Sequence, residues 1–353
     1  MDIDASFYNA IDLLKKLIAI PSYSREEKAA ADALESYMND LHLHPFRKGN
    51  NIGLLSPDWD ERKPVILLNS HIDTVKPVAG WTKNPLLPEE DGDYLFGLGS
   101  NDAGASLVSL LYSFLTLTQR EQPNNFIFLA SCEEEISGAN GIASVLPELP
   151  AIDFALVGEP TNMQPAIAER GLMVLDGIVV GQAGHAARDE GDNAIYKAIP
   201  VIRWFKETQF PLKSDLLGAV KMTVTMVNAG TQHNVIPGEC RFTVDVRSNE
   251  HYTNRALFDW IAAHCGCEIT ARSFRLNSSG ISTDHPFVRR AMLLGRQPFG
   301  SPTTSDQAQM PFPSLKMGPG QSSRSHTADE YILYPEIREA MELYIRLLDQ
   351  LNL

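Results

Sequence analysis

Cysteine is scarce in this sequence: the 353 residues contain four, Cys132, Cys240, Cys265 and Cys267. Their spacing shows no disulfide framework of the kind found in small secreted domains. His264 lies next to Cys265, but no second Cys or His pair lies nearby in the sequence to complete a tetrahedral metal site. We therefore expect packing or turn residues at these positions, and a reducing, cytoplasmic location.

Basic charge and long apolar runs are also lacking. The 30 Lys and Arg residues are outnumbered by 44 Asp and Glu, which gives a formal net charge of −14 and argues against nucleic acid and anionic membranes as partners. No segment reaches the roughly 18 consecutive apolar residues of a membrane span. The first residues are acidic rather than basic, so we expect no signal peptide.

Several common catalytic motifs are missing. The sequence has no GxSxG nucleophile elbow and no GxxxxGK[ST] phosphate loop. Its glycine-rich "GLGSND" departs from a dinucleotide fingerprint, because Asp102 occupies the last position and would repel a pyrophosphate. A glycosidase with paired carboxylates would leave two histidines, His71 and His326, without a role.

The first 170 residues do contain a regular alternation of elements. Apolar runs typical of buried strands cover 64–75, 124–134 and 153–160. Helical periodicity covers 4–20, 25–41 and 103–119. This alternation predicts a layered α/β domain with a largely parallel sheet.

The middle of the chain has a different pattern, with alternating strands flanked by glycines. The predicted strands cover 171–182, 218–230 and 238–248, and the predicted helices cover 193–209 and 254–265. They indicate a small α+β domain with an antiparallel sheet. The α/β pattern then resumes with helices at 285–295 and 328–351 and a strand at 313–318. We therefore predict a catalytic domain of residues 1–171 and 281–353, interrupted by a smaller domain of residues 172–280.

Polar side chains follow each predicted strand of the first domain or lie in its loops. The candidates for a functional site are His71, Asp73, Asp102, Glu134, Glu135, Glu159 and His326. Ligands of open α/β sheets bind beyond the carboxyl ends of the strands, so we expect these side chains to meet. Imidazole and carboxylate groups suit Zn²⁺ and tolerate Mn²⁺ or Co²⁺. The set is large enough for two ions that share a bridging carboxylate.

Each candidate has an ordinary structural explanation when it is taken alone. Asp102 in a glycine-rich turn can be a turn residue, and a run of glutamates is usually a solvated face. The arrangement of the clusters along successive strand ends favours a metal site over these explanations.

Two pairs of residues that are close in the sequence indicate that the members of each pair have different roles. His71 and Asp73 are two residues apart and point to the same side of an extended strand, so Asp73 could accept the second ring N–H of His71. Adjacent glutamates at a turn can serve different tasks. One can bind metal while its neighbour takes a proton from the attacking water.

These residues lie in motifs that resemble one enzyme family. The motifs are "SHIDTV", "GLGSNDAG", "EEEISGANG", "VGEPT", "GHAARDEGDNAI", "NVIPGECRFTVDVR" and "GPGQSSRSHTADEYI". In this order they resemble the metal-dependent aminoacyl hydrolases, which include acetylornithine deacetylase, succinyl-diaminopimelate desuccinylase, glutamate carboxypeptidase and aminoacylase. The resemblance spans residues 70 to 331 and looks greatest to acetylornithine deacetylase. It implies a zinc-peptidase-like catalytic domain and a ferredoxin-like lid and dimerisation domain.

The resemblance also implies roles for individual residues. Asp102 would bridge two divalent ions, Zn²⁺ in the first place. The remaining ligands would be His71 and Glu159 for one ion, and Glu135 and His326 for the other. Glu134 would be the general base, and Glu133 would be a flank without a catalytic role. The family's lysine after the bridging aspartate is missing here, since Asp102 is followed by "AGAS", which weakens the subfamily assignment only.

Three residues of the predicted insert match family positions associated with substrate. His185 matches a histidine that reaches across a dimer to polarise the scissile carbonyl. Asn234 and Arg247 match substrate-binding positions, and the guanidinium of Arg247 suits capture of an α-carboxylate. The homodimer and the small-molecule N-acyl amino acid substrate are likewise implied by the resemblance.

The resulting expectation is a two-metal hydrolase that removes an acetyl group from an amino acid such as N-acetylornithine, in arginine biosynthesis. Acetylcitrulline, a succinylated amino acid such as succinylornithine or succinyl-diaminopimelate, and a dipeptide stay open as substrates. A succinyl group would need a further cation, for which Arg324 and Arg188 are candidates. An inactive dimeric binding protein is the alternative from another functional class.

Overall fold

The computed structural model describes residues 3–188 and 190–353, which form two compact units. Unit 1 contains the residues up to Ile167 together with Gly280–Phe299 and Ser305–Leu353, and unit 2 contains Ala168–Ser279 and Gly300–Thr304. The return of 300–304 to unit 2 was not anticipated from the sequence.

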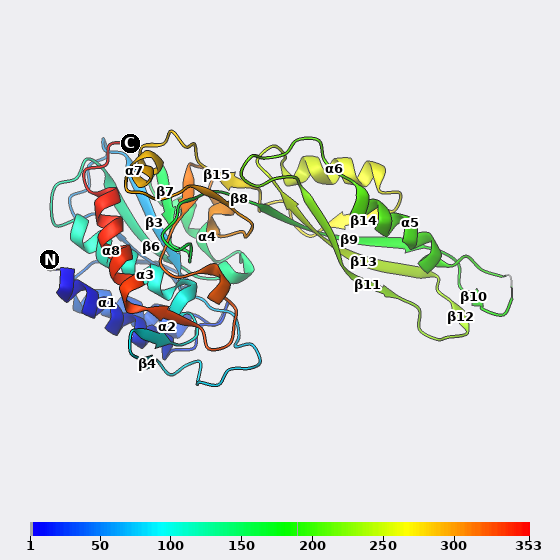
Figure 1. Ribbon diagram of the computed structural model, residues 1–353, viewed down its shortest axis with the longest axis horizontal. Helices are drawn as coiled ribbons and strands as arrows, with labels where there is room; N and C mark the ends of the chain where they lie inside the picture. The colour runs from blue at the N-terminus through cyan, green and yellow to red at the C-terminus, as the bar shows by residue number, and fades with distance from the viewer. Residues whose placement is uncertain (1–2, 189) are drawn as a thin grey trace. The chain divides into compact units, whose positions relative to one another are not determined.

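Unit 1 is built on a mixed sheet with a parallel centre (Figure 1). Its order is β1 (Phe46–Lys48), β2 (Asn51–Leu55), β6 (Asn125–Ser131), β3 (Val65–His71), β7 (Phe154–Val157), β17 (Ser314–Lys316) and β8 (Ala166–Glu169). Strands β6, β3, β7 and β17 are parallel, whereas β1 and β2 pair antiparallel at one edge. The short strands β15 (Ser279–Gly280) and β16 (Phe299–Ser301) pair with β8 where the chain passes between units.

Both faces of this sheet are covered, which explains why its strands read as continuous apolar runs. Ile66 and Leu68 of β3 pack in the core cluster that contains the helices α1, α3 and α8, whereas Val65 and Leu67 pack on the other face with Ile142 of α4. The helices of unit 1 are α1 (Ile3–Ile18), α2 (Lys28–Asp40), α3 (Ala105–Leu117), α4 (Ile142–Val145), α7 (Pro286–Leu293) and α8 (Tyr334–Leu348).

The C-terminal helix begins later than the sequence pattern predicts. Residues 328–351 were expected to be helical, but α8 begins at Tyr334. Tyr331–Leu333 instead form β18, which pairs with β5 (Tyr94–Phe96), and β5 pairs with β4 (Glu89–Asp91). Pro335 occupies the first turn of α8, where its fixed φ and missing N–H suit a helix start.

Unit 2 has the order of elements of a ferredoxin-like fold. Its elements run β9 (Gly171–Val180), α5 (Ala194–Glu207), β11 (Lys221–Ala229), β13 (Glu239–Ser248), α6 (Asn254–His264) and β14 (Glu268–Ala271). The antiparallel sheet has the order β11-β13-β9-β14, and the two helices share a hydrophobic core with it. A separate two-stranded sheet joins β10 (Gly184–His185) to β12 (Val235–Ile236). The predicted α/β and α+β classes are both confirmed.

The carboxyl ends of the parallel strands of unit 1 lie side by side at the same end of the sheet. His71 is level with Ser131, Asn69 is level with Val157, and Val157 is level with Lys316. The segments that follow these strands therefore leave the sheet side by side. Within the described part of the chain, no helix has the length and apolar character needed to cross a bilayer.

Candidate metal centre

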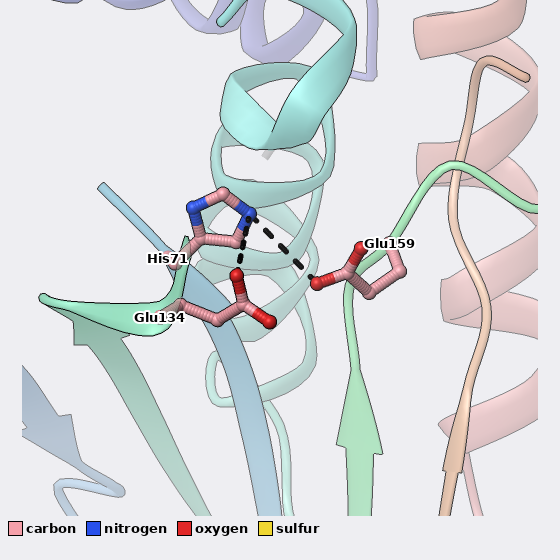
Figure 2. Close-up of side chains that lie close together, drawn as sticks. All are labelled: His71, Glu134 and Glu159. Atoms are coloured by element: carbon pink, nitrogen blue, oxygen red, sulfur yellow. Dashed lines mark ion pairs between the residues drawn. The ribbon is translucent and has the colours of Figure 1, made fainter. Parts of the chain in front are cut away.

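The segments beyond the carboxyl ends of the parallel strands bring together side chains from distant parts of the sequence of unit 1. His71 is the last residue of β3, Glu134 and Glu135 lie in the turn η2 (Glu134–Ile136) after β6, and Glu159 follows β7. Asp102 lies in the turn η1 (Ser100–Gly104) before α3, and its peptide bond to Ala103 is cis. Figure 2 shows His71, Glu134 and Glu159 pointing toward one another.

Asp102 lies between two histidines. Its Oδ1 is 3.2 Å from Nε2 of His71, and its Oδ2 is 3.7 Å from Nε2 of His326. The same Nε2 of His71 lies 3.8 Å from Oε1 of Glu159. The same Nε2 of His326 lies 2.9 Å from Oε2 of Glu135. Each oxygen of Asp102 therefore faces a different cluster of nitrogen and oxygen atoms, as a bridging ligand requires.

Glu134 is also close to His71, since its Oε2 lies 3.9 Å from Nε2. Within residues 3–188 and 190–353, two groups of three side chains have ligand atoms close enough for one ion: His71, Glu134 and Glu159, and His71, Asp102 and Glu135. These distances place both adjacent glutamates at the cluster, and they do not by themselves separate a ligand from a base.

The chemistry of the cluster fits divalent cations. Glu159 Oε1 is buried, and no donor of the described residues makes a hydrogen bond to it. Burial together with the charge of Asp102 raises the pKa of Glu159 to about 8. Burial and Glu159 raise the pKa of Glu134 well above its usual value. Positive charge placed among these groups would stabilise their ionised forms.

The two histidines already experience this excess of carboxylate. Burial opposes the charged form of His71, but Glu134 and Asp102 raise its pKa well above the usual range. The hydrogen bond that His326 donates to the Glu135 carboxylate raises the pKa of His326 to about 9. Protons therefore occupy the nitrogens that metal ions would take, and metal binding would release them.

Asp73 contacts the second ring nitrogen of His71 through its side chain, as the sequence predicts, and also through its main chain. Nδ1 of His71 lies 2.8 Å from the main-chain carbonyl oxygen of Asp73 and 3.6 Å from its carboxylate. The carboxylate also accepts the main-chain N–H groups of Glu134 and Glu135 at 2.9 and 3.1 Å, and the Ser24 hydroxyl at 2.8 Å. Asp73 therefore fixes the His71 ring through its carbonyl and the glutamate turn through its carboxylate.

Glu133 faces away from this cluster, which explains how three consecutive glutamates are accommodated. It has a φ of 55° and is buried. Its carboxylate accepts the Asn140 main-chain N–H at 3.2 Å and side-chain amide at 2.8 Å. An added Cβ at Gly138 would lie 1.8 Å from Glu133 Oε2. Glu133 thus stabilises the loop between itself and Asn140 by hydrogen bonds, a role that the sequence did not reveal.

Sequence reasoning also missed Glu330, which directly precedes β18. Its buried carboxylate accepts the main-chain N–H of Asp102 at 2.9 Å. Burial and the charge of Asp102 raise the pKa of Glu330 to about 8. Its position four residues after His326 is the signal that could have drawn attention to it.

The three residues predicted in the insert lie in unit 2, and the structure brings two of them together. His185 in β10 is exposed and level with Val235, and the carbonyl of the adjacent Asn234 accepts the N–H of Ala186 at 3.0 Å. Arg247 lies near the far end of β13 and binds Asp245 through two hydrogen bonds of 2.8 and 3.0 Å.

Comparison with known proteins supports the assignment of this chain to the metal-dependent hydrolases. The chain is 28% identical over 354 residues to succinyl-diaminopimelate desuccinylase from Corynebacterium glutamicum, covering 91% of this chain and 90% of that one. It is 25% identical over 375 residues to acetylornithine deacetylase from Proteus mirabilis, covering 96% of each.

A solved structure extends the likeness to the fold. The YXEP protein of Bacillus subtilis, described as a dinuclear metal-binding peptidase from the M20 family, matches with a TM-score of 0.72 at 18% identity, covering 99% of this chain and all of that one (100%). The family model "Peptidase family M20/M25/M40" matches residues 67–350. This chain therefore belongs to peptidase family M20/M25/M40, and it is a hydrolytic enzyme of a metallopeptidase family.

Proposed function

We propose that this enzyme hydrolyses the amide between a small acyl group and an amino acid, with two divalent metal ions held in unit 1. The observation that carries the proposal is the position of Asp102, with one oxygen toward His71 and the other toward His326. The ligands for one ion would be Asp102, His71 and Glu159, and those for the other Asp102, Glu135 and His326.

Bound divalent cations supply Lewis acidity, which polarises the amide carbonyl and acidifies water. Glu134 then takes the proton of the attacking water and returns it to the leaving amine. Its high pKa in the metal-free protein indicates a carboxyl that can carry a proton. His185 would stabilise the developing oxyanion across a dimer, and Asn234 and Arg247 would bind the amino-acid portion.

The acyl group has two candidates, each favoured by a separate observation. Arg324 is already bound to Glu336 by hydrogen bonds of 2.7 and 3.0 Å, so its guanidinium is engaged within the protein. This favours acetyl, and N-acetylornithine is the first substrate to test. The similarity to succinyl-diaminopimelate desuccinylases favours succinyl, with Arg188 as the remaining candidate for its carboxylate.

A substrate panel tests this function directly. The zinc-loaded enzyme is assayed for released amine with acetylornithine, acetylcitrulline, succinylornithine, succinyl-diaminopimelate and several dipeptides, beside the metal-free enzyme. We expect about two zinc ions per chain and turnover of one acyl class well above the others. Two bound ions with no hydrolysis across the panel would favour a binding protein, and no bound zinc would overturn the metal site itself.

A further inference from the structure

Glu330 receives an unusual number of hydrogen bonds from the segment that carries Asp102. Its carboxylate accepts the main-chain N–H groups of Gly99 at 3.0 Å, Asn101 at 2.9 Å and Asp102 at 2.9 Å. Its main-chain carbonyl accepts the N–H of Gly97 at 3.0 Å. Gly99 has a φ of 75°, which lets successive N–H groups converge on one anion. The main chain of the turn before α3 is thus held by hydrogen bonds to a single buried side chain.

A second link joins the same two segments. The side-chain oxygen of Asn101 accepts the N–H of Gln321 at 3.0 Å, and its amide donates to the Gln321 carbonyl at 3.1 Å and to Ser325 Oγ at 3.3 Å. The fit is close, because an added Cβ at Gly320 would lie 2.2 Å from the Asn101 oxygen. Hydrogen bonds therefore join residues 97–102 to residues 321–330, up to Asp102 in the first segment and on both sides of His326 in the second.

We infer that Glu330 is a positioning residue that holds Asp102 between the two histidines, so that metal affinity depends on the Glu330 carboxylate. The inference rests on the proposed function, in which Asp102 bridges the ions. Within the described part of the chain, Glu330 makes no hydrogen bond or ion pair with His71 or His326, and it acts through the main chain of the Asp102 turn. Outer groups that orient ligands typically change metal affinity about 10- to 100-fold when they are removed.

Glu330→Gln isolates the carboxylate from the packing. The glutamine has the same shape, but its NH₂ group would face at least one of the three main-chain donors, and the turn would have to move. Glu330→Asp keeps the charge and both acceptor oxygens on a side chain one methylene shorter. We expect zinc affinity to fall at least about tenfold in Glu330→Gln and less in Glu330→Asp.

Asn125→Ala provides a matched control. Asn125 is also buried, and it holds a loop by accepting the Asp60 N–H at 3.1 Å and donating to the Asp60 carbonyl at 2.7 Å. It lies at the amino end of β6, whereas the site lies beyond the carboxyl ends. We expect this variant to lose stability and to keep wild-type zinc affinity.

The measurements are zinc titration of the metal-free proteins against a chromophoric chelator, and amide hydrogen exchange without metal, both at about pH 8.5, above the pKa of Glu330 of about 8. In Glu330→Gln the amides of residues 99, 101 and 102 should exchange faster than in the wild type and in Asn125→Ala. Wild-type zinc affinity in Glu330→Gln, an equal loss in Asn125→Ala, or unchanged exchange would overturn the inference. If the wild type bound no zinc, the proposed function itself would be wrong. The exchange result alone would then show whether Glu330 holds the main chain of the Asp102 turn.

Discussion

The adjacent residues Glu134 and Glu135 are assigned different tasks, and the main chain explains how this is possible. Both N–H groups are bound by the carboxylate of Asp73, which fixes the turn while the side chains diverge. Glu135 reaches His326 at 2.9 Å, whereas Glu134 reaches His71 at 3.9 Å. The two side chains therefore lie beside different histidines, and the proposed roles, Glu135 as a ligand and Glu134 as the base, need a separate test.

Exchanging each glutamate for glutamine distinguishes these tasks. We expect Glu134→Gln to keep zinc and to lose turnover about 10²- to 10⁴-fold or more, because it removes proton transfer without removing a ligand. Glu135→Gln should lose zinc affinity. Elemental analysis after gel filtration and steady-state rates check both variants. The reverse pattern, with zinc lost only from Glu134→Gln, would exchange the two roles.

At the scale of single residues, the sequence predicted those site residues whose side chains are typical metal ligands or bases. His71, Glu134 and Glu159 stand at the ends of apolar runs, so the parallel sheet alone predicts that they converge. The carboxylates that hold the main chain were not predicted, because Glu133 and Glu330 act on N–H groups that are distant or only defined once the loops fold. The sequence also predicted the contact of Asp73 with His71, but not the hydrogen bonds of its carboxylate to the main chain of Glu134 and Glu135.

At the scale of elements, the strands buried on both faces were easier to predict than the shortest strands. The strands β3, β6 and β7 are covered on both faces and therefore have continuous apolar sequences. The three-residue strands β4, β5 and β18 are too short for any periodicity, and their pairing joins residues 94–96 to 331–333. This pairing also replaced the first turn of the predicted C-terminal helix.

The start of α8 provides a test of acyl specificity. Glu336 of α8 accepts the N–H of Leu333 at 3.0 Å and binds Arg324, whose guanidinium also lies 4.4 Å from the Tyr331 ring centroid. We expect Arg324→Lys to lower stability, because lysine cannot reproduce a paired contact with a carboxylate. The ratio of kcat/KM for succinylated over acetylated substrates should stay unchanged.

Arg188→Ala is the companion variant, since Arg188 is exposed and its Nη1 lies 4.0 Å from Oε2 of the likewise exposed Glu190. If a succinyl carboxylate is bound by Arg188, this variant lowers the same ratio and leaves stability unchanged. A ratio that falls in Arg324→Lys instead would show that the partly buried ion pair of Arg324 and Glu336 opens to admit substrate.

At the scale of the whole molecule, the two units are expected to contribute to one reaction. His185 lies on the exposed β10 of unit 2, whereas Glu134 lies in unit 1. If His185 acts across a dimer, subunits with His185→Ala and subunits with Glu134→Ala are each inactive, but their heterodimers contain one complete site. Mixing the variants should recover partial activity. Verified heterodimers without activity would exclude action across the dimer.

The charge of the site also makes stability depend on pH, and the direction follows from the pKa shifts. The pKa of Glu159 and of Glu330 is raised by burial and Asp102 to about 8, from a usual 4.5, and that of His326 is raised by Glu135 to about 9, from 6.5. Between the usual and the raised values the folded protein binds more protons than the unfolded chain, so stability falls as pH rises. Asp73 and Asp102 have lowered pKa values, and their contribution is complete above the acid range.

We therefore expect the metal-free enzyme to be less stable at about pH 8.5 than at about pH 5.5. Zinc should reverse this trend. It replaces the protons on His71, His326 and the carboxylates, and protons compete with it less as pH rises, so the stabilisation by zinc grows with pH. Urea unfolding of both forms at the two pH values measures this difference. A metal-free enzyme that gains stability toward pH 8.5 would mean that its carboxyl groups ionise without a cation, and the electrostatic argument for the metal centre would lose its basis.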